Sequence, residues 1–211
     1  MSNGTTMIYH ITHKDNLEGI IARGGLVAQS EMAKDPISYC NIAHITIQDR
    51  RAYTPVPCGP GGNLHDYVPF YFAPRSPMLY AIHRGNVENC TAGQTDIIYL
   101  VSSAESVAAS GLEFTFTDGH GIMTLSDFYD DFEDLDAIDW DVMKAKYWRD
   151  TDDDPDRKRR RQAEFLVYKE FPWDMVEMIA VMNSDIKINV GGILSNAPQK
   201  PPIHVKPEWY Y

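Results

Sequence analysis

The sequence contains few cysteines, three among 211 residues, and they lie far apart. Cys40, Cys58 and Cys90 form no CxxC pair, which argues against a zinc site built on thiolates. An odd number of cysteines in a chain without a secretion signal indicates reduced thiols rather than disulfides. We therefore assign the cysteines no chemical role and predict no metal site.

Long apolar runs are also missing from the sequence. The longest apolar stretches, such as residues 178–182, are far too short to span a bilayer. Residues 1–6 are polar and lack the charged-then-apolar pattern of a signal peptide. From these two features we expect a cytoplasmic protein with no membrane partner.

Neither an internal repeat nor a dinucleotide-binding fingerprint occurs in the sequence. Because no G-x-G-x-x-G follows a predicted strand, a Rossmann fold is disfavoured. Hydrophobic residues make up 44% of the chain, which is enough for a packed core. The length suits a single domain over residues 1–211.

The charge is acidic overall but unevenly distributed along the chain. The net charge of -11 argues against a general nucleic-acid coat protein, because phosphate contacts require cations. Residues 127–156 are strongly acidic and are followed directly by the basic run 157–161, and Arg50 and Arg51 form a second basic cluster. A locally basic groove is therefore possible, and nucleic-acid binding in it should be modest and salt-sensitive.

Local patterns predict short strands and helices without regular βαβ alternation, which indicates an α+β fold. Proline after Ser76 predicts the start of a helix, and Gly111 predicts the end of another. Phe128, Phe132 and Leu135 have helical spacing, so we expect a helix there. Predicted strands cover residues 7–11, 67–73, 96–101, 113–117, 163–169, 176–182 and 203–206, and further helices are expected after a Thr12 cap, after a Ser102–Glu105 capping box, and over residues 140–148.

The segment YHITH, residues 9–13, lies where the first predicted strand enters a helix. The His10 ring can form hydrogen bonds with a ribose or an amide, and the nearby helix N-terminus favours an anionic ligand such as a pyrophosphate. Asn16 and Leu17 follow on the same helix. The alternative is a histidine whose hydrogen bonds are satisfied within the fold, beside an ordinary helix cap.

Two further segments carry groups suited to anionic or planar ligands. Arg51 can donate a fork of hydrogen bonds to a phosphate or a carbonyl, although a solvated surface is the alternative. Alternation along strand 67–73 places Tyr71 on one face and Phe70 and Phe72 on the other. One face must be core, and Tyr71 on the other face can stack on a planar ring unless it is also core.

Glu164 opens an otherwise apolar strand directly after the basic run. A carboxylate in a partly dry cleft can accept hydrogen bonds from ribose hydroxyls and stabilise the cation that forms when a C1′–N bond breaks. A salt bridge to the preceding arginines is the alternative. His120 lies between two glycines, which predicts a turn, and metal binding there lacks identifiable partner ligands.

These segments together resemble the DarT family, the DNA ADP-ribosyltransferase toxins of DarT–DarG toxin–antitoxin systems. The resemblance covers nearly the whole chain, and its longest segment, residues 61–82, is specific. The matching segments are IYHITHKDNLEGI (8–20), IQDRR (47–51), GGNLHDYVPFYFAPRSPMLYAI (61–82), FTDGHG (116–121) and RQAEFLVYKEFPW (161–173).

The resemblance implies a compact ADP-ribosyltransferase fold related to the poly(ADP-ribose) polymerases, with mixed central sheets and flanking helices. It implies NAD as the ADP-ribose donor and co-substrate, without a metal. The acceptor would be a thymine base within a short sequence motif of single-stranded DNA. A macrodomain antitoxin of the DarG type would be the partner, and we expect this chain to be a monomer.

The resemblance also implies roles for particular residues. His10 and Thr12 would hold the nicotinamide end of NAD, Asn16 and Leu17 would lie along the same cleft, Tyr71 would stack on the nicotinamide, Arg51 would act at the reaction centre, and Glu164 would be the catalytic carboxylate. For the DNA strand, Arg75, Met78 and His120 are candidate contacts by charge or stacking. The basic run before Glu164 is a candidate element for reading the acceptor.

The alternative functions are an NAD-dependent RNA 2′-phosphotransferase, a guanine-directed DNA ADP-ribosyltransferase and a non-enzymatic nucleic-acid-binding module. The glutamate in QAEFLV argues against the phosphotransferase, which relies mainly on basic residues. Net acidity argues against the binding module. We expect a glycosyltransferase of the pentosyltransferase type and assign it to the nucleotidyltransferases as well.

Overall fold

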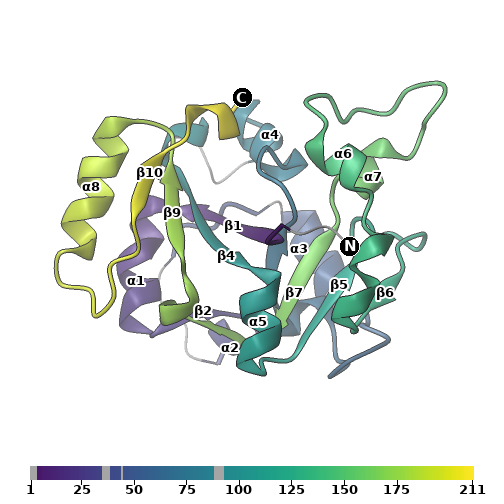
Figure 1. The fold of residues 1–211 in the computed structure, drawn as a ribbon, viewed down its shortest axis with the longest axis horizontal. Helices are drawn as coiled ribbons and strands as arrows, with labels where there is room; N and C mark the ends of the chain where they lie inside the picture. The colour runs from purple at the N-terminus through teal and green to yellow at the C-terminus, as the bar shows by residue number, and fades with distance from the viewer. Residues whose placement is uncertain (1–3, 35–38, 44, 88–92) are drawn as a thin grey trace.

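The computed structural model describes residues 4–34, 39–43, 45–87 and 93–211, so Cys90 lies outside the described residues. Most strands belong to an eight-stranded sheet in the order β10-β9-β4-β1-β3-β7-β5-β6 (Figure 1). Neighbours within the described sheet are antiparallel, apart from the parallel pair β9 and β10. The strands are β1 Met7–His13, β3 Tyr67–Tyr71, β4 Ile97–Ser103, β5 Phe114–Thr117, β6 Phe128–Tyr129, β7 Glu164–Tyr168, β9 Met178–Val181 and β10 Ile203–Val205, and a separate two-stranded sheet pairs β2 Gly25–Val27 with β8 Glu170–Pro172.

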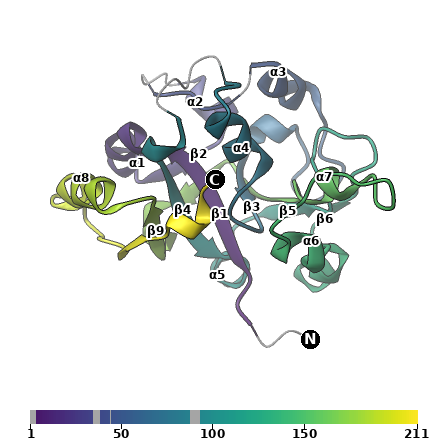
Figure 2. The same cartoon turned by 90° about the horizontal axis from the view of Figure 1, so that it is seen from above.

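Helices cover both sides of the large sheet. The α-helices are α1 Leu17–Ala22, α2 Gln29–Met32, α3 Ile45–Tyr53, α4 Pro77–His83, α5 Ala104–Ser110, α6 Trp140–Lys144, α7 Arg157–Arg160 and α8 Ser184–Leu194. Figure 2 shows α1, α2 and α3 along one side and α5 along the other, with α8 at the β9 end and α6 and α7 at the β6 end. Among the described helices, none combines the length and apolarity that crossing a membrane requires.

Several helix ends follow from the local sequence as predicted. The Ser76 side chain accepts a hydrogen bond from the backbone N–H of Leu79 at 3.2 Å, and Pro77 occupies the first helical position of α4. Gly111 ends α5 in the left-handed conformation, with a φ of 78°. The predicted strands are confirmed, with ends that differ by a few residues from those expected.

The helix expected from the spacing of Phe128, Phe132 and Leu135 is wrong. The first of these residues belongs to β6, which pairs with β5, and the other two belong to a 3-10 helix, Phe132–Ala137. The side chain of Asp131 caps that helix, so the chain changes structure between the two phenylalanines. Pairing with β5 therefore decides the conformation of this segment rather than its apolar spacing.

Two predicted helix caps lie one residue away from the observed ones. His13 rather than Thr12 caps the short 3-10 helix after β1, and Ser103 rather than Ser102 caps α5. The carboxylate of Glu105, expected to complete a capping box, instead accepts hydrogen bonds from the backbone N–H just before β1. That contact fixes the start of β1 against α5.

The central strands separate the main hydrophobic core from a cavity. Phe70 on β3 and Phe165 and Val167 on β7 are buried in the main core. Tyr71 and Glu164 are partners across β3 and β7, and both line the cavity on the opposite face. The alternation predicted for β3 is thus confirmed, and the sheet places a tyrosine beside a carboxylate.

Candidate active site

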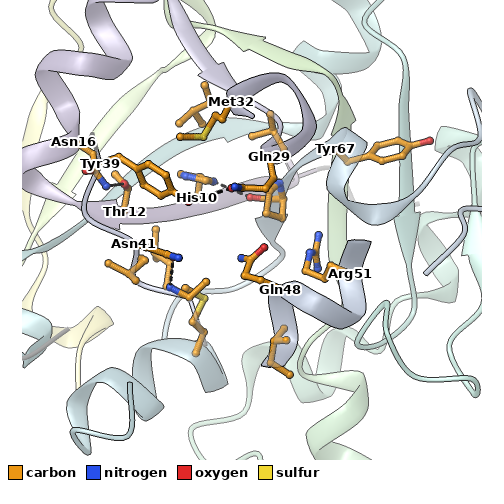
Figure 3. A pocket seen from close by; sticks show the side chains of 18 of the residues that line it. His10, Thr12, Asn16, Gln29, Met32, Tyr39, Asn41, Gln48, Arg51 and Tyr67 are labelled. Atoms are coloured by element: carbon orange, nitrogen blue, oxygen red, sulfur yellow. Dashed lines mark hydrogen bonds between the residues drawn. The ribbon is translucent and has the colours of Figure 1, made fainter. Parts of the chain in front are cut away.

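A cavity of about 520 Å³ lies between β1, β3 and β7 on one side and α1, α2, α3 and α4 on the other. Figure 3 shows His10, Thr12 and Asn16 on one wall, with Gln48 and Arg51 facing them from α3. The volume falls in the range of small-molecule and cofactor sites. The wall residues come from segments far apart in the sequence, so the cavity exists only in the folded chain.

The Glu164 carboxylate accepts three hydrogen bonds at one end of this cavity. Arg51 Nη1 lies 2.6 Å from Glu164 Oε2, the backbone N–H of Gly121 donates to Oε1 at 3.1 Å, and His120 Nδ1 lies 3.3 Å from the same oxygen. Glu164 and Arg51 are 4% and 7% exposed, so this ion pair is largely shielded from water. An interaction between such charges is stronger than at the surface.

The Glu164 carboxylate is held in its ionised form. Burial alone would raise the pKa of Glu164. The charge of Arg51 and the hydrogen bond from His120 lower it by more than burial raises it, and the resulting pKa is about 2. The site therefore presents a fixed negative charge at neutral pH. Such a charge is suited to stabilising a positive charge that develops on a bound substrate.

Arg51 keeps one donor for a ligand. Its Nη1 binds Glu164, whereas its Nη2 is buried and has no hydrogen-bond partner among the described residues. Leaving a buried donor unpaired costs roughly 1–3 kcal/mol, so a ligand oxygen that accepts from Nη2 would recover this free energy. A phosphate, a carboxamide or a base carbonyl supplies such an oxygen.

His10 is neutral and has a fixed orientation. Its Nδ1 lies 2.8 Å from the carbonyl oxygen of Pro69, which can only accept, so Nδ1 carries the proton. Burial lowers the pKa of His10 to about 4, although the hydrogen bond to Pro69 acts in the opposite direction. The remaining ring nitrogen, Nε2, is therefore an acceptor for a donor such as an amide or a hydroxyl group.

Asn16 holds one wall of the cavity in place. Its Nδ2 donates to Thr12 Oγ1 at 3.0 Å and to the Cys40 carbonyl at 2.9 Å, and its Oδ1 accepts from the Cys40 N–H at 2.7 Å. The side chain thereby ties the segment 39–43 to β1. Tyr39, on this segment, donates from its hydroxyl to Gln29 of α2 at 3.2 Å.

Tyr71 lies beside Glu164 and reaches α4. Its hydroxyl donates to the sulfur of Met78 at 3.6 Å, and both residues line the cavity. Burial and the nearby negative charge of Glu164 raise the pKa of Tyr71, so the phenol stays protonated. The ring is held between the sheet and α4.

Comparison with known proteins agrees with this geometry. A family model described as "ssDNA thymidine ADP-ribosyltransferase, DarT" matches residues 9–211. The chain belongs to the DarT family. A DNA ADP-ribosyl transferase from Thermus sp. (strain 2.9) is 47% identical to this chain over 208 residues, which cover 98% of this chain and 96% of the relative.

Solved structures of the DarT family have the same fold. Thermus sp. 2.9 DarT in complex with ADP-ribosylated ssDNA aligns with a TM-score of 0.92 at 46% identity, covering 98% of this chain and 97% of that one. Thermus sp. 2.9 DarT in complex with NAD+ aligns with a TM-score of 0.88 at 42% identity, covering 100% of both chains. The predicted ADP-ribosyltransferase fold is thereby confirmed.

Most of the residues that the DarT resemblance singles out meet at the cavity. The cavity is lined by His10, Thr12, Asn16, Arg51, Tyr71, Met78, His120 and Glu164. Their binding and catalytic roles remain predictions. Within the part of the chain that the structure describes, no group of three or more His, Cys, Asp or Glu side chains is arranged to hold a metal ion.

Leu17 and Arg75 are not among the residues that line the cavity. Leu17 is fully buried in the hydrophobic core at the start of α1, and its role in holding NAD remains a prediction. The guanidinium carbon of Arg75 lies 4.5 Å from the centre of the Tyr211 ring, outside the cavity lining. A role for Arg75 in holding DNA remains a prediction, and the structure gives it a structural contact in addition.

Sequence reasoning missed several cavity residues. His65 Nε2 lies 2.9 Å from Gln48 Oε1, and both residues line the cavity beside Arg51. Burial and the charge of Arg51 lower the pKa of His65. Both residues lie inside the segments that resemble the DarT family, so the signal was present in IQDRR and GGNLHDY but was not used.

The basic run before Glu164 is largely engaged within the protein. Arg159 pairs with Asp118 and Asp156, and Arg160 pairs with acidic residues of the preceding segment. Arg161 is buried and donates to backbone carbonyls of α6 and its C-terminal end. The alternative for Glu164, a salt bridge to the preceding arginines, is wrong for the described residues, because its carboxylate pairs with Arg51 instead. Reading of the acceptor by this segment remains a prediction.

Proposed function

We propose that this protein transfers ADP-ribose from NAD to thymine bases of single-stranded DNA. The observation that carries the proposal is the buried Glu164 carboxylate, held ionised by Arg51 and His120 in a cavity of cofactor size. Membership of the DarT family supports the reaction, as do the relatives solved with NAD+ and with ADP-ribosylated ssDNA.

The residues of the cavity fit NAD. We assign the nicotinamide end to His10 Nε2, Thr12 and the ring of Tyr71, because an acceptor, a hydroxyl and an aromatic face suit a planar carboxamide. NAD supplies an ADP-ribosyl group whose C1′–N bond breaks as nicotinamide leaves. Glu164 stabilises the positive charge that develops at C1′ during this step.

Arg51 orients and activates the acceptor base. Its unpaired Nη2 donates to a thymine carbonyl, which lowers the cost of removing the proton from the adjacent N3. The reaction forms the C1′–N3 bond, breaks the C1′–nicotinamide bond and releases the N3 proton. With a pKa of about 2, Glu164 is better suited to stabilising charge than to accepting this proton. Single-stranded DNA exposes N3 without the cost of flipping a base.

The bond that is exchanged defines the enzyme class. An N-glycosidic bond at C1′ is broken and another is formed, while the phosphate linkages of ADP-ribose stay intact. The protein is therefore a pentosyltransferase, and the additional assignment to the nucleotidyltransferases is wrong because no nucleotidyl phosphate is transferred.

The test is a labelling reaction with purified protein, NAD and oligonucleotides. We expect wild type to shift a thymine-containing single strand in a gel, with a mass increase of one ADP-ribose, and Glu164→Gln to lose this activity by about 100- to 1000-fold or more. The isosteric glutamine keeps the volume and removes the charge. Equal labelling by Glu164→Gln contradicts its catalytic role, and equal labelling of a thymine-free strand containing guanine contradicts the acceptor.

Three further properties belong to this proposal. The protein acts as a toxin in the cytoplasm, works as a monomer, and has a macrodomain antitoxin of the DarG type as its partner. Adding such a macrodomain should remove the ADP-ribose from labelled DNA. Sedimentation at micromolar concentration should give the mass of one chain, 24.0 kDa.

A further inference from the structure

Among the arginines of α7, only Arg159 donates side-chain hydrogen bonds to the turn that carries His120, within the part of the chain that the structure describes. We define the His120 turn as residues 118–126. We propose that Arg159 is a positioning residue for ADP-ribosyl transfer, an inference that rests on the proposed function. Arg159 acts by holding the His120 turn against the Glu164 carboxylate.

The guanidinium of Arg159 joins the two ends of the His120 turn. Its Nη1 donates to Asp118 Oδ1 at 3.0 Å and to Ser126 Oγ at 3.2 Å, while Nε and Nη2 bind the two oxygens of Asp156 at 2.8 Å each. The side chain is only 12% exposed. A planar guanidinium can bind one carboxylate through two parallel hydrogen bonds and still donate to two further groups, a geometry that a lysine ammonium cannot reproduce.

Both backbone groups of His120 are linked to Arg159, and the carbonyl also accepts from the Met123 N–H at 2.9 Å. The His120 N–H donates to the Arg159 carbonyl at 3.1 Å. The His120 carbonyl accepts from Ser126 Oγ at 2.8 Å, and that same hydroxyl accepts from the Arg159 guanidinium. The position of the His120 peptide therefore depends on α7 on both sides.

The glycine before His120 makes this approach possible. A Cβ atom on Gly119 would overlap Arg159 Nη1, so a larger residue there would require the guanidinium to move. The guanidinium thus packs directly on the backbone of the turn. This contact gives a physical reason for the first glycine of the Gly-His-Gly pattern.

The other side of the His120 turn contacts the catalytic carboxylate. His120 Nδ1 and the Gly121 N–H both bind Glu164 Oε1. Thr117 Oγ1 accepts from the Glu164 N–H at 3.1 Å and donates to the Gly119 carbonyl at 2.6 Å. A shift of the turn would therefore move the donors that orient the carboxylate and lower its pKa.

The neighbouring arginine provides a matched control. Arg157 lies on the same helix and pairs with Asp154, and its other described contact is the Tyr147 carbonyl. Neither partner belongs to the His120 turn. Arg157→Gln and Arg159→Gln therefore remove the same charge from the same helix, and only the second removes a contact with the turn.

The experiment compares these variants in steady-state kinetics and in amide exchange. We expect Arg159→Gln to lower kcat about 10- to 100-fold, a typical cost of misplacing a catalytic group, with KM for NAD changed less than about twofold. The acid limb of the kcat profile should move to higher pH, because Glu164 loses hydrogen bonds that lower its pKa. Exchange of the Gly121 amide should accelerate about tenfold or more, as a loosened hydrogen bond predicts.

Arg157→Gln should match wild type in Gly121 exchange, in KM for NAD, and in kcat and its pH profile at saturating oligonucleotide. A change in KM for the oligonucleotide alone would bear on acceptor reading by the basic run and not on the turn. If Arg159→Gln does not fold, Ser126→Ala removes the hydroxyl that links the guanidinium to the His120 carbonyl and should show the same changes at smaller size. The inference is overturned if the Gly121 amide of Arg159→Gln exchanges at the wild-type rate. It is also overturned if that exchange accelerates while kcat and its pH profile stay unchanged. A wild-type protein that labels no oligonucleotide would instead overturn the proposed function, while the exchange data still report on the turn.

Discussion

At the scale of single residues, the cavity brings together a neutral, a negative and a positive side chain, those of His10, Glu164 and Arg51. His10 is neutral because desolvation lowers its pKa, and this effect outweighs the hydrogen bond from Nδ1 to a carbonyl, which raises the pKa. Glu164 is negative because Arg51 and the His120 turn outweigh the effect of burial. This combination presents an acceptor, an anion and an unpaired arginine donor to one ligand, without further protonation changes near neutral pH.

The lowered pKa of His10 predicts a pH-dependent contribution to stability. The unfolded chain binds a proton at His10 below pH 6.5, but the folded protein does so only near pH 4. Stability is therefore lost as the pH falls from 6.5 to 4, by on the order of 3 kcal/mol before partial contact with cavity water reduces it. His10→Gln should lack this loss, as measured by urea unfolding at pH 7, 5.5 and 4.

The exposed His204 provides the control for this measurement. His204→Gln should keep the pH dependence of wild type. Parallel stability curves for wild type and His10→Gln would contradict the assignment of a neutral, buried imidazole at this position.

At the scale of elements, α4 carries Met78, the predicted DNA contact, and its stability depends on a helix cap. Ser76 caps α4, which carries Met78, and Asn183 caps α8 at the far end of the sheet (Figure 1). Loss of either cap should lower the free energy of unfolding by about 1 kcal/mol. Ser76→Ala should also raise KM for the oligonucleotide severalfold, whereas Asn183→Ala should leave it unchanged.

Urea unfolding and steady-state labelling measure the two effects separately. An equal rise of KM in both cap variants would show that general loss of stability, and not the position of α4, affects DNA binding. An unchanged KM in both would contradict the predicted contact between Met78 and DNA.

Elements with a local signal were predictable from the sequence. Ser76 with its following proline and Gly111 mark helix ends by backbone chemistry alone, and the alternation on β3 identified its cavity face. The sequence patterns did not predict α8, whose tandem glycines weaken helix propensity. Its buried Ile186 and Val190 show that packing against the sheet stabilises it instead.

The site was predictable only to the extent that single segments carry it. The resemblance identified Arg51 and Glu164, but their pairing joins residues 113 positions apart and follows from the fold. Spacing alone left open whether Glu164 is catalytic or forms a salt bridge with the arginines next to it. Those arginines turn toward the acidic segment because their carboxylate partners lie outside the cavity, and local sequence contains no information on that direction.

At the scale of the whole molecule, an acidic protein must bind a polyanion with few available cations. The net charge is -11, and several arginines of the basic run are paired internally. We therefore expect DNA affinity to fall with salt at a slope of about -2 on logarithmic axes, which corresponds to roughly three phosphate contacts on a single strand.

Fluorescence anisotropy with a labelled oligonucleotide measures this slope. The salt concentration is varied from about 50 to about 300 mM, a range in which such slopes are resolved. A methylphosphonate strand of the same sequence, which has an uncharged backbone, should give a slope near zero. A slope steeper than about -5 for natural DNA would reveal a basic surface that the charge distribution does not predict.

The order of the strands determines when in its synthesis the protein becomes active. β7 lies between β3 and β5, although both precede it in the sequence. A nascent chain that has left the ribosome only as far as β6 contains His10 and Arg51 but no Glu164, and the facing edges of β3 and β5 still lack the strand that joins them. Truncated translation products that end before β7 therefore lack Glu164, and under the proposed function we expect them to expose a cell to no transferase activity.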